Sequence, residues 1–180
     1  FNRILTYITI GFILLLTQPV FGEHADFSGM EIRLFEHINN ARVNPLQTAA
    51  SFGMNPDAVL ASLPELHDIL LNGLPPLYYN ANLSNSARAH KTDMLNNNYY
   101  NHISPDGRTP DDRIRAAGYI AGVTGESLGI LGFVNFISPE EAADSIFENM
   151  FRDELDPERV ERRNILAFDV EEMGAGFGAG

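Results

Sequence analysis

Residues 87–128 read ARAHKTDMLNNNYYNHISPDGRTPDDRIRAAGYIAGVTGESL. This stretch contains His90 and His102, two of the five histidines of the chain, and it ends near Glu126, an acid between a glycine and a serine. Residues 104–107, directly after His102, are Ser-Pro-Asp-Gly, in which proline presets the turn and glycine takes the left-handed position. Because rigid loops position functional side chains, we expect any functional site to be built here.

A helix is predicted to carry His90. Leu83, Ala87, His90 and Met94 follow one another at steps of four, three and four, which places the imidazole on the buried face of that helix. A histidine among apolar neighbours is either a hydrogen-bonded core residue or a ligand with a second group nearby. The pattern leaves both readings of His90 open.

Glu126 lies in a part of the chain that is poor in charge. Residues 128–136 contain only apolar side chains, glycine and asparagine. A single acid in such surroundings either has a hydrogen-bonding partner in a partly buried place or lies at the wall of a cavity.

Capping signals predict the other helices. Helices are expected to begin at Ser28, at Asn80 or Asn82, at Thr109 and at Ser138, each an N-cap residue before an apolar pattern. Residues 46–76 contain several prolines and a glycine, so we predict a helical excursion in short pieces there. A short helical piece carrying Glu161 should follow Asp156-Pro157, and residues 173–177 are predicted to form a strand.

Composition indicates one domain that does not bind nucleic acid. The chain has 180 residues, 44% of them hydrophobic, enough for a single core. Its formal net charge is -12, which repels phosphate backbones. There are no cysteines, so disulfides and thiolate metal sites are excluded.

Residues 1–22 are predicted to be a secretory signal peptide that lies outside the fold. Arg3 supplies positive charge, residues 8–16 are apolar apart from Thr9 and Gly11, and residues 18–22 resemble a cleavage region. The alternative, an uncleaved membrane anchor, would need roughly 20 apolar residues. We therefore expect a secreted protein, extracellular or periplasmic, with membrane contact only if this segment is retained.

Several ordered motifs extend over nearly all of residues 29–180. They are Asn39-Asn40-Ala41-Arg42, Ala87 with His90 and Asp93-Met94, His102-x-Ser104-Pro105-x-Gly107, Asp112-Arg113-Ile114, Ala117-Gly118-Tyr119, Gly125-Glu126, Arg162-x-Asn164-Ile165-Leu166 and Glu172-Met173-Gly174-Ala175-Gly176. With these motifs the chain resembles the CAP superfamily of cysteine-rich secretory, antigen 5 and pathogenesis-related 1 proteins. The resemblance is strongest to its cysteine-free bacterial members, called SCP-like.

The resemblance implies an α+β fold of the CAP type. An α-β-α sandwich is expected, with a small antiparallel sheet between helical layers and a solvent-open cavity. Residues 23–180 would form this single domain, with a helical insertion near residues 46–76. The last strand of the family would come after Gly180.

The resemblance also implies a cavity lined by two histidines and two acids, which in some members hold a divalent metal. His102 matches the first histidine and Glu126 the first acid. The second acid falls near Asn149, beside Glu148, and Glu161 stands where the second histidine would be. No histidine follows His102, so a zinc site of the family kind lacks a ligand. His102, Glu126 and Glu161 are the candidate cavity residues, and only His102 and Glu126 are candidate ligands for a divalent metal.

Three functions are compatible with these residues. The first is a secreted module that binds a small apolar or amphipathic, lipid-like ligand or a cell-surface partner. The second is a metal-assisted hydrolase with Glu126 as the base and His102 as a metal ligand or acid. The third is a non-catalytic structural domain with a vestigial cavity. Because two of the four cavity positions differ from the family pattern, we expect binding rather than catalysis and name no catalytic residue.

Overall fold

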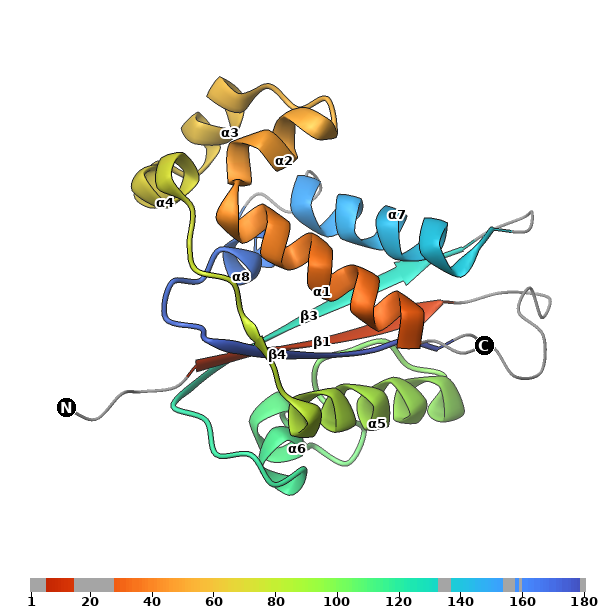
Figure 1. The fold of residues 1–180 in the computed structure, drawn as a ribbon. Coiled ribbons are helices and arrows are strands. Elements are labelled where there is room, and N and C mark those ends of the chain that lie inside the picture. The colour runs from red at the N-terminus through yellow and green to blue at the C-terminus, as the bar shows by residue number, and fades with distance from the viewer. Residues whose placement is uncertain (1–5, 15–27, 133–136, 154–157, 159, 179–180) are drawn as a thin grey trace.

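A computed structural model shows a sheet enclosed by two layers of helices (Figure 1). The structure describes residues 6–14, 28–132, 137–153, 158 and 160–178. Helices α1 (Ser28–Val43) and α7 (Pro139–Arg152) cover one face of the sheet, and α5 (Ala81–Asn97) and α6 (Pro110–Ala116) cover the other. The predicted α+β class and three-layered α-β-α architecture are confirmed.

Within the described residues the sheet has four strands, and its pairings are parallel. The strands are β1 (Thr6–Leu14), β2 (Tyr78–Tyr79), β3 (Val123–Leu131) and β4 (Glu172–Gly176), in the order β2-β4-β1-β3. β1 pairs in parallel with both β3 and β4, and β2 pairs in parallel with β4. The expected antiparallel sheet is therefore wrong. Helices lie between successive strands, and such crossovers return the chain in the same direction.

The N-terminal apolar segment lies inside the sheet. Thr6 pairs with Val123 of β3, and Tyr7 pairs with Glu172 of β4, so β1 occupies the position between these strands. We expected residues 1–22 to lie outside the fold, and for residues 6–14 the structure differs. A short apolar run rich in isoleucine and threonine suits a central strand as well as the core of a signal peptide, so composition alone does not separate the two. Removal of this segment during export stays a prediction.

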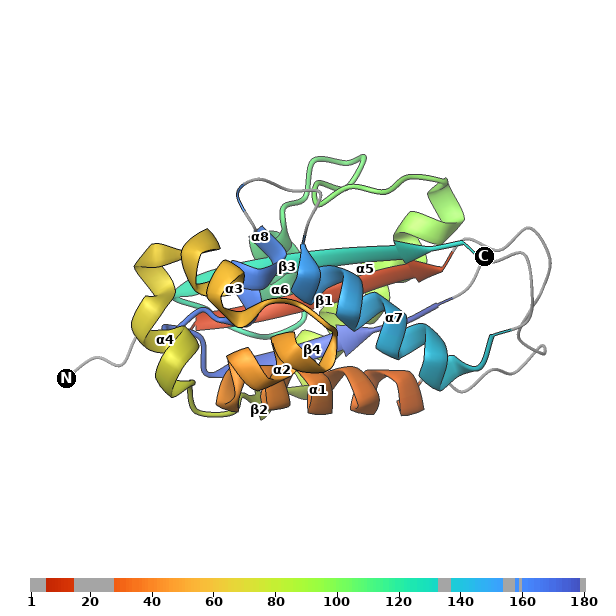
Figure 2. The same ribbon diagram turned by 90° about the horizontal axis from the view of Figure 1, so that it is seen from above.

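Short helices follow α1. The region predicted to form a helical insertion holds α2 (Pro45–Ser51), α3 (Pro56–Ser62), the 3-10 helix η1 (Pro64–Leu66) and α4 (His67–Asn72). Figure 2 shows these elements at one end of the layer that contains α1 and α7. Near the C-terminus, α8 (Val160–Ile165) carries Glu161, whereas the predicted helix start at residues 156–157 lies outside the described residues.

The helix starts agree with the capping signals. The Asn80 side chain accepts hydrogen bonds from the first amides of α5, and Thr109 and Ser138 form capping boxes at α6 and α7. These interactions satisfy backbone donors that the helix itself leaves free. The predicted strand near residues 173–177 is confirmed as β4, whereas β3 was not predicted as a strand.

Buried side chains of α1 and α7 form the main core. Leu34 and Ile38 of α1 pack with Ile146, Phe147 and other buried residues in one hydrophobic cluster. On the opposite face, α5 lies directly against β4 at Gly174 and Gly176, where the backbones come close together. The sheet is thereby held between both helical layers. Among the described residues, no helix combines the length and apolar character needed to cross a membrane.

Arg42 ties α1 to the segment before β4. Its guanidinium is buried and donates to the carbonyl oxygens of Pro75, Ile165, Ala167 and Val170. Burial lowers the pKa of Arg42 to about 10. The side chain therefore serves as a structural cross-link within the α1 layer.

Candidate functional site

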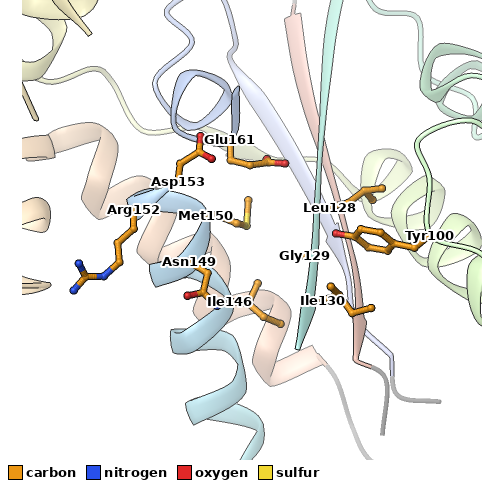
Figure 3. Close-up of a pocket in the computed structure, with 10 residues that line it drawn as sticks. All are labelled: Tyr100, Leu128, Gly129, Ile130, Ile146, Asn149, Met150, Arg152, Asp153 and Glu161. Atoms are coloured by element: carbon orange, nitrogen blue, oxygen red, sulfur yellow. The ribbon is translucent and has the colours of Figure 1, made fainter. Parts of the chain in front are cut away.

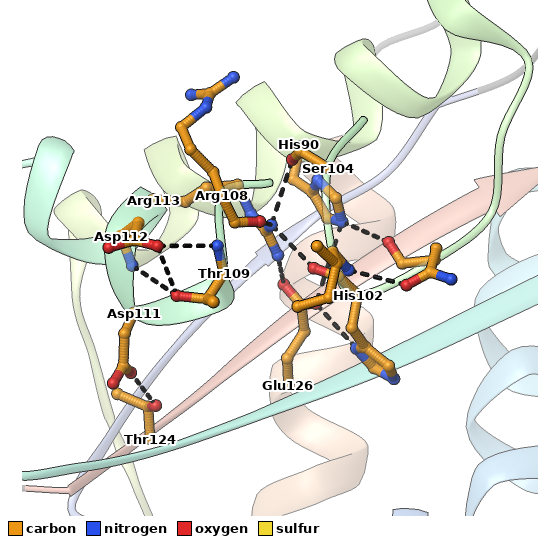
Figure 4. A network of polar contacts seen from close by, with 12 residues as sticks. His90, His102, Ser104, Arg108, Thr109, Asp111, Asp112, Arg113, Thr124 and Glu126 are labelled. Atoms are coloured by element: carbon orange, nitrogen blue, oxygen red, sulfur yellow. Dashed lines mark hydrogen bonds and ion pairs between the residues drawn. The ribbon is translucent and has the colours of Figure 1, made fainter. Parts of the chain in front are cut away.

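Three elements bring the candidate site together on the side of the sheet covered by α5 and α6. Glu126 lies on β3, His102 lies in the loop after α5, and Arg113 projects from α6 (Figure 4). The turn after His102 is closed by hydrogen bonds from the Gly107 amide to the Ser104 carbonyl and from the Ser104 amide to the Arg108 carbonyl. A rigid loop thus presents the imidazole to the strand.

The carboxylate of Glu126 is paired on both oxygens. His102 Nδ1 lies 2.8 Å from Glu126 Oε1, and Arg113 Nη2 donates to Glu126 Oε2 at 2.7 Å. The Glu126 side chain is only 2% exposed, whereas that of His102 is 49% exposed. A buried charge is tolerated when it is paired and hydrogen-bonded in this way. The structure therefore brings His102 and Glu126 together, and Glu126 combines a partner with a buried position.

Arg113 organises the loop as well as the carboxylate. Its Nη1 donates to the carbonyls of His102 at 2.8 Å and Arg108 at 3.1 Å, and to Ser104 Oγ at 3.3 Å. From the sequence, Arg113 is only a member of the Asp112-Arg113-Ile114 motif, without a predicted role. The available signal was Glu126 itself, because a buried carboxylate needs a cation and arginine can satisfy it with several donors.

His90 lies behind this cluster as a hydrogen-bonded core residue. It is fully buried, and its Nε2 lies 3.0 Å from the Asn101 carbonyl and 3.9 Å from Glu126 Oε1. The Tyr99 hydroxyl, which donates to Asp93 Oδ2 at 2.5 Å, lies 3.4 Å from His90 Nδ1. The core reading of His90 accounts for these contacts, and its imidazole supports the loop that carries His102.

The pKa values of the two histidines are shifted in opposite directions. The hydrogen bond to Glu126 raises the pKa of His102, whereas burial lowers the pKa of His90. His102 therefore contributes stability that is complete below its unfolded pKa of about 6.5 and is lost as the pH rises through its higher folded pKa. His90 acts oppositely, because stability is lost as the pH falls below about 6.5 and the unfolded imidazole takes up a proton.

NMR titration of the imidazole signals measures which of the two histidines has the higher pKa. We expect His102 to titrate above His90, and Glu126→Gln to lower the pKa of His102 because it removes the charged acceptor. If both imidazoles titrated at the same pH in the wild-type protein, the His102–Glu126 pair would be absent in solution.

Glu161 lines a cavity on the α7 side of the sheet, and it lies near enough to His102 for its charge to help raise the pKa of that imidazole (Figure 3). The cavity has a volume of about 430 Å³, and its described lining includes Glu161 and Asn149 but neither His102 nor Glu126. Its other lining residues are Tyr100, Leu128, Gly129, Ile130, Ile146, Met150, Arg152 and Asp153. The structure thus pairs His102 with Glu126, and of the three predicted cavity residues only Glu161 lines this cavity.

Comparison with known protein families identifies the fold. The model of the cysteine-rich secretory protein family, CAP, matches residues 35–179. The chain belongs to the CAP family. The comparisons with curated proteins and with solved structures find no significant match. The matched range includes α5, the His102 loop, β3, the cavity and β4, so the site described above lies within the CAP domain.

The described donor groups at His102 and Glu126 do not fit a divalent metal. Within the described parts of the chain, no three histidine, aspartate or glutamate side chains come together as an ion site. Glu126 is already bound on both oxygens, and one of its partners is the guanidinium of Arg113, whose positive charge opposes a second cation. We therefore derive no chemistry from a metal at His102 and Glu126.

Ser104 is not placed for nucleophilic attack in this CAP domain. Its buried hydroxyl accepts a hydrogen bond from Arg113 Nη1 at 3.3 Å and lies 3.4 Å from the Tyr99 hydroxyl oxygen, to which it can donate because the Tyr99 proton is used on Asp93. The imidazole of His102 is directed to Glu126 instead. A serine nucleophile needs a base within hydrogen-bonding reach, and the described contacts of Ser104 supply none.

Proposed function

We propose that this CAP domain is exported and binds a small apolar or amphipathic molecule in the cavity between α7 and β3. The observation that carries the proposal is the cavity itself, whose volume of about 430 Å³ lies in the range of small-molecule sites. Leu128, Ile130, Ile146 and Met150 supply apolar walls, and Glu161 and Asn149 supply a few polar groups. Apolar walls with a few polar groups are typical of sites for amphipathic ligands.

The contacts of Glu126 favour ligand binding over hydrolysis as the function of this domain. A general base must have an oxygen available to the substrate, but both oxygens of Glu126 are engaged and its side chain is buried. These contacts suit a structural support for the loop better than proton transfer.

The proposal of export rests on the composition of the N-terminal segment, which suits a signal peptide core as well as the strand β1. Residues 8–16 have the apolar composition of a signal peptide core, and Arg3 precedes them. Outside the cytoplasm, the domain would meet lipids, lipid-derived amphiphiles and surface components of cells. A cell-surface partner is the alternative occupant of this region, and ligand binding assays on the isolated protein distinguish the two.

Filling the cavity should weaken the binding of an apolar molecule. The neutral fluorophore N-phenyl-1-naphthylamine is expected to bind the wild-type chain with enhanced fluorescence, and Ile130→Trp should weaken this binding by about tenfold or more, because the indole occupies the cavity. Ile130 is 40% exposed at the cavity wall, so the larger side chain can be accepted without disrupting the core.

Ile120→Trp is the matched control. Ile120 is 86% exposed, does not line the cavity, and should leave fluorophore binding unchanged. An equal loss in both variants, or no binding to the wild-type chain, would contradict ligand binding in this cavity. Turnover of an ester or peptide by the purified chain would instead support the hydrolase reading.

A further inference from the structure

The cavity contains a carboxylate oxygen without a partner. Glu161 Oε2 is buried from solvent and has no hydrogen-bonding partner among the described residues. Figure 3 shows the Glu161 carboxylate directed from α8 towards the space between α7 and β3. Buried polar atoms are nearly always satisfied, so an unsatisfied acceptor at a cavity indicates a missing donor.

The surroundings of Glu161 make the cavity electronegative. Asp153, which is 7% exposed, also lines the cavity and follows directly after α7. The last carbonyls of α7, those of Phe151 and Arg152, accept hydrogen bonds from the Arg162 guanidinium, so the negative charge at the cavity comes from the carboxylates of Glu161 and Asp153. Two carboxylates in the lining repel anions and attract a cation.

The guanidinium of Arg152, the arginine in the described lining, contacts other groups. Arg152 Nε donates to Glu148 Oε1 at 2.7 Å, and its Nη2 donates to the carbonyl of Phe52. Figure 3 shows the guanidinium directed away from the cavity. The positive charge of Arg152 is therefore used on the outer side of α7.

The protonation of Glu161 responds to the same environment. Burial raises the pKa of Glu161, and this effect is larger than the opposing effects of its hydrogen bonds with Ser127 and Leu128 and of the nearby His102. Removal from water disfavours the charged carboxylate, and a bound cation would restore it. A cationic ligand would therefore bind this carboxylate more favourably than a neutral ligand would, because it stabilises the charged form.

The walls are suited to the remainder of such a ligand. Ile130, Ile146 and Met150 offer apolar contact for an alkyl chain, and the ring of Tyr100 lies on the opposite side of the cavity from α7. Aromatic rings attract ammonium groups through their π-electrons. An apolar chain and a positive charge can therefore be accommodated together.

We propose that the cavity selects amphiphiles that carry a protonated amine, with the ammonium group bound by Glu161 and the alkyl chain against Ile146 and Met150. This inference rests on the proposed function, because it names the class of molecule for the same cavity. It differs from metal binding by the family pattern, because an ammonium group needs hydrogen-bond acceptors and a ring, and no set of converging metal ligands.

Displacement of N-phenyl-1-naphthylamine by three eight-carbon compounds tests the selectivity. Octylammonium, 1-octanol and octanoate share the same chain and differ in the charge of the head group. Octylammonium is expected to displace the fluorophore at a concentration about tenfold lower than 1-octanol, since a hydrogen bond between charged groups exceeds a neutral one by about this factor. Octanoate should be the weakest, because two carboxylates repel it.

Glu161→Gln isolates the charge at nearly constant shape. It should remove the preference for octylammonium over 1-octanol while fluorophore binding persists. Glu36→Gln, which removes the same charge from the exposed face of α1, should leave the preference intact.

The outcomes separate the two proposals. If the fluorophore binds and the three compounds compete equally, or if Glu161→Gln keeps the preference, the amine inference is overturned and cavity binding stands. If neither the fluorophore nor any of the three compounds binds the wild-type chain, the proposed function itself fails.

Discussion

Arg113→Met is expected to lower the free energy of unfolding by about 3–5 kcal/mol, because it removes the cation from a buried ion pair. The side chains of Arg113 and Glu126 are 5% and 2% exposed, and their contact at 2.7 Å is the closest charge pairing of the Glu126 carboxylate. Without Arg113, Glu126 would keep only His102, and the carbonyls of His102 and Arg108 would lose a donor. Chemical denaturation of both proteins measures the difference.

Two further variants establish the cause of this loss. Arg115→Met changes an exposed arginine on the same helix and should alter stability by no more than about 0.5 kcal/mol. The double variant Arg113→Met/Glu126→Leu should recover part of the loss, because replacing both members of a buried pair removes the stranded charge. Equal effects of the changes at Arg113 and Arg115 would contradict a buried pair.

Gly174→Ala is expected to destabilise the protein by about 3 kcal/mol or more through overpacking. A Cβ atom at Gly174 would lie 2.1 Å from the backbone nitrogen of Ser84 and 2.3 Å from the carbonyl carbon of Leu83. These are backbone atoms of α5, so the helix must move away from β4 as a unit. Thermal or chemical unfolding would detect the loss.

Gly29→Ala provides the control for the same chemical change. Gly29 lies in the first turn of α1, and a Cβ atom there would have no neighbour within 4 Å. Alanine is the better helix former, so this variant should be neutral or more stable by up to about 1 kcal/mol. If Gly174→Ala were also neutral, the close approach of α5 to β4 would not exist in solution.

Local signals predicted most of the helical layers. Asn80, Thr109 and Ser138 act as caps within their own helices, and Leu83, Ala87 and Met94 face the core as their spacing required. Such signals depend on residues a few positions apart, so one chain is sufficient to read them. Strand β3 was missed because its apolar and glycine-containing run shows no alternation, and a strand enclosed by helices on both faces need not alternate.

The candidate site was predicted in part. His102, Glu126 and Glu161 were expected to line one cavity. The structure places His102 Nδ1 2.8 Å from Glu126 Oε1, and of the three only Glu161 belongs to the described lining of the cavity. The position of Glu161 at a separate cavity and the contacts of Arg113 were not foreseen, because they depend on how α6, α7 and α8 lie against β3. The parallel pairing of β1 between β3 and β4 was likewise absent from the expectation.

The sequence by itself determined the CAP family, the starts of α5, α6 and α7 and the position of a histidine beside a rigid turn, because these follow from ordered motifs and from contacts within one turn of the chain. Only the tertiary structure decided which charges meet. Arg113 and Glu126 are separated by 13 residues and come from a helix and a strand, and Glu161 faces a cavity formed with α7. Burial and pairing of charges depend on distances in space between elements whose relative positions no local pattern specifies.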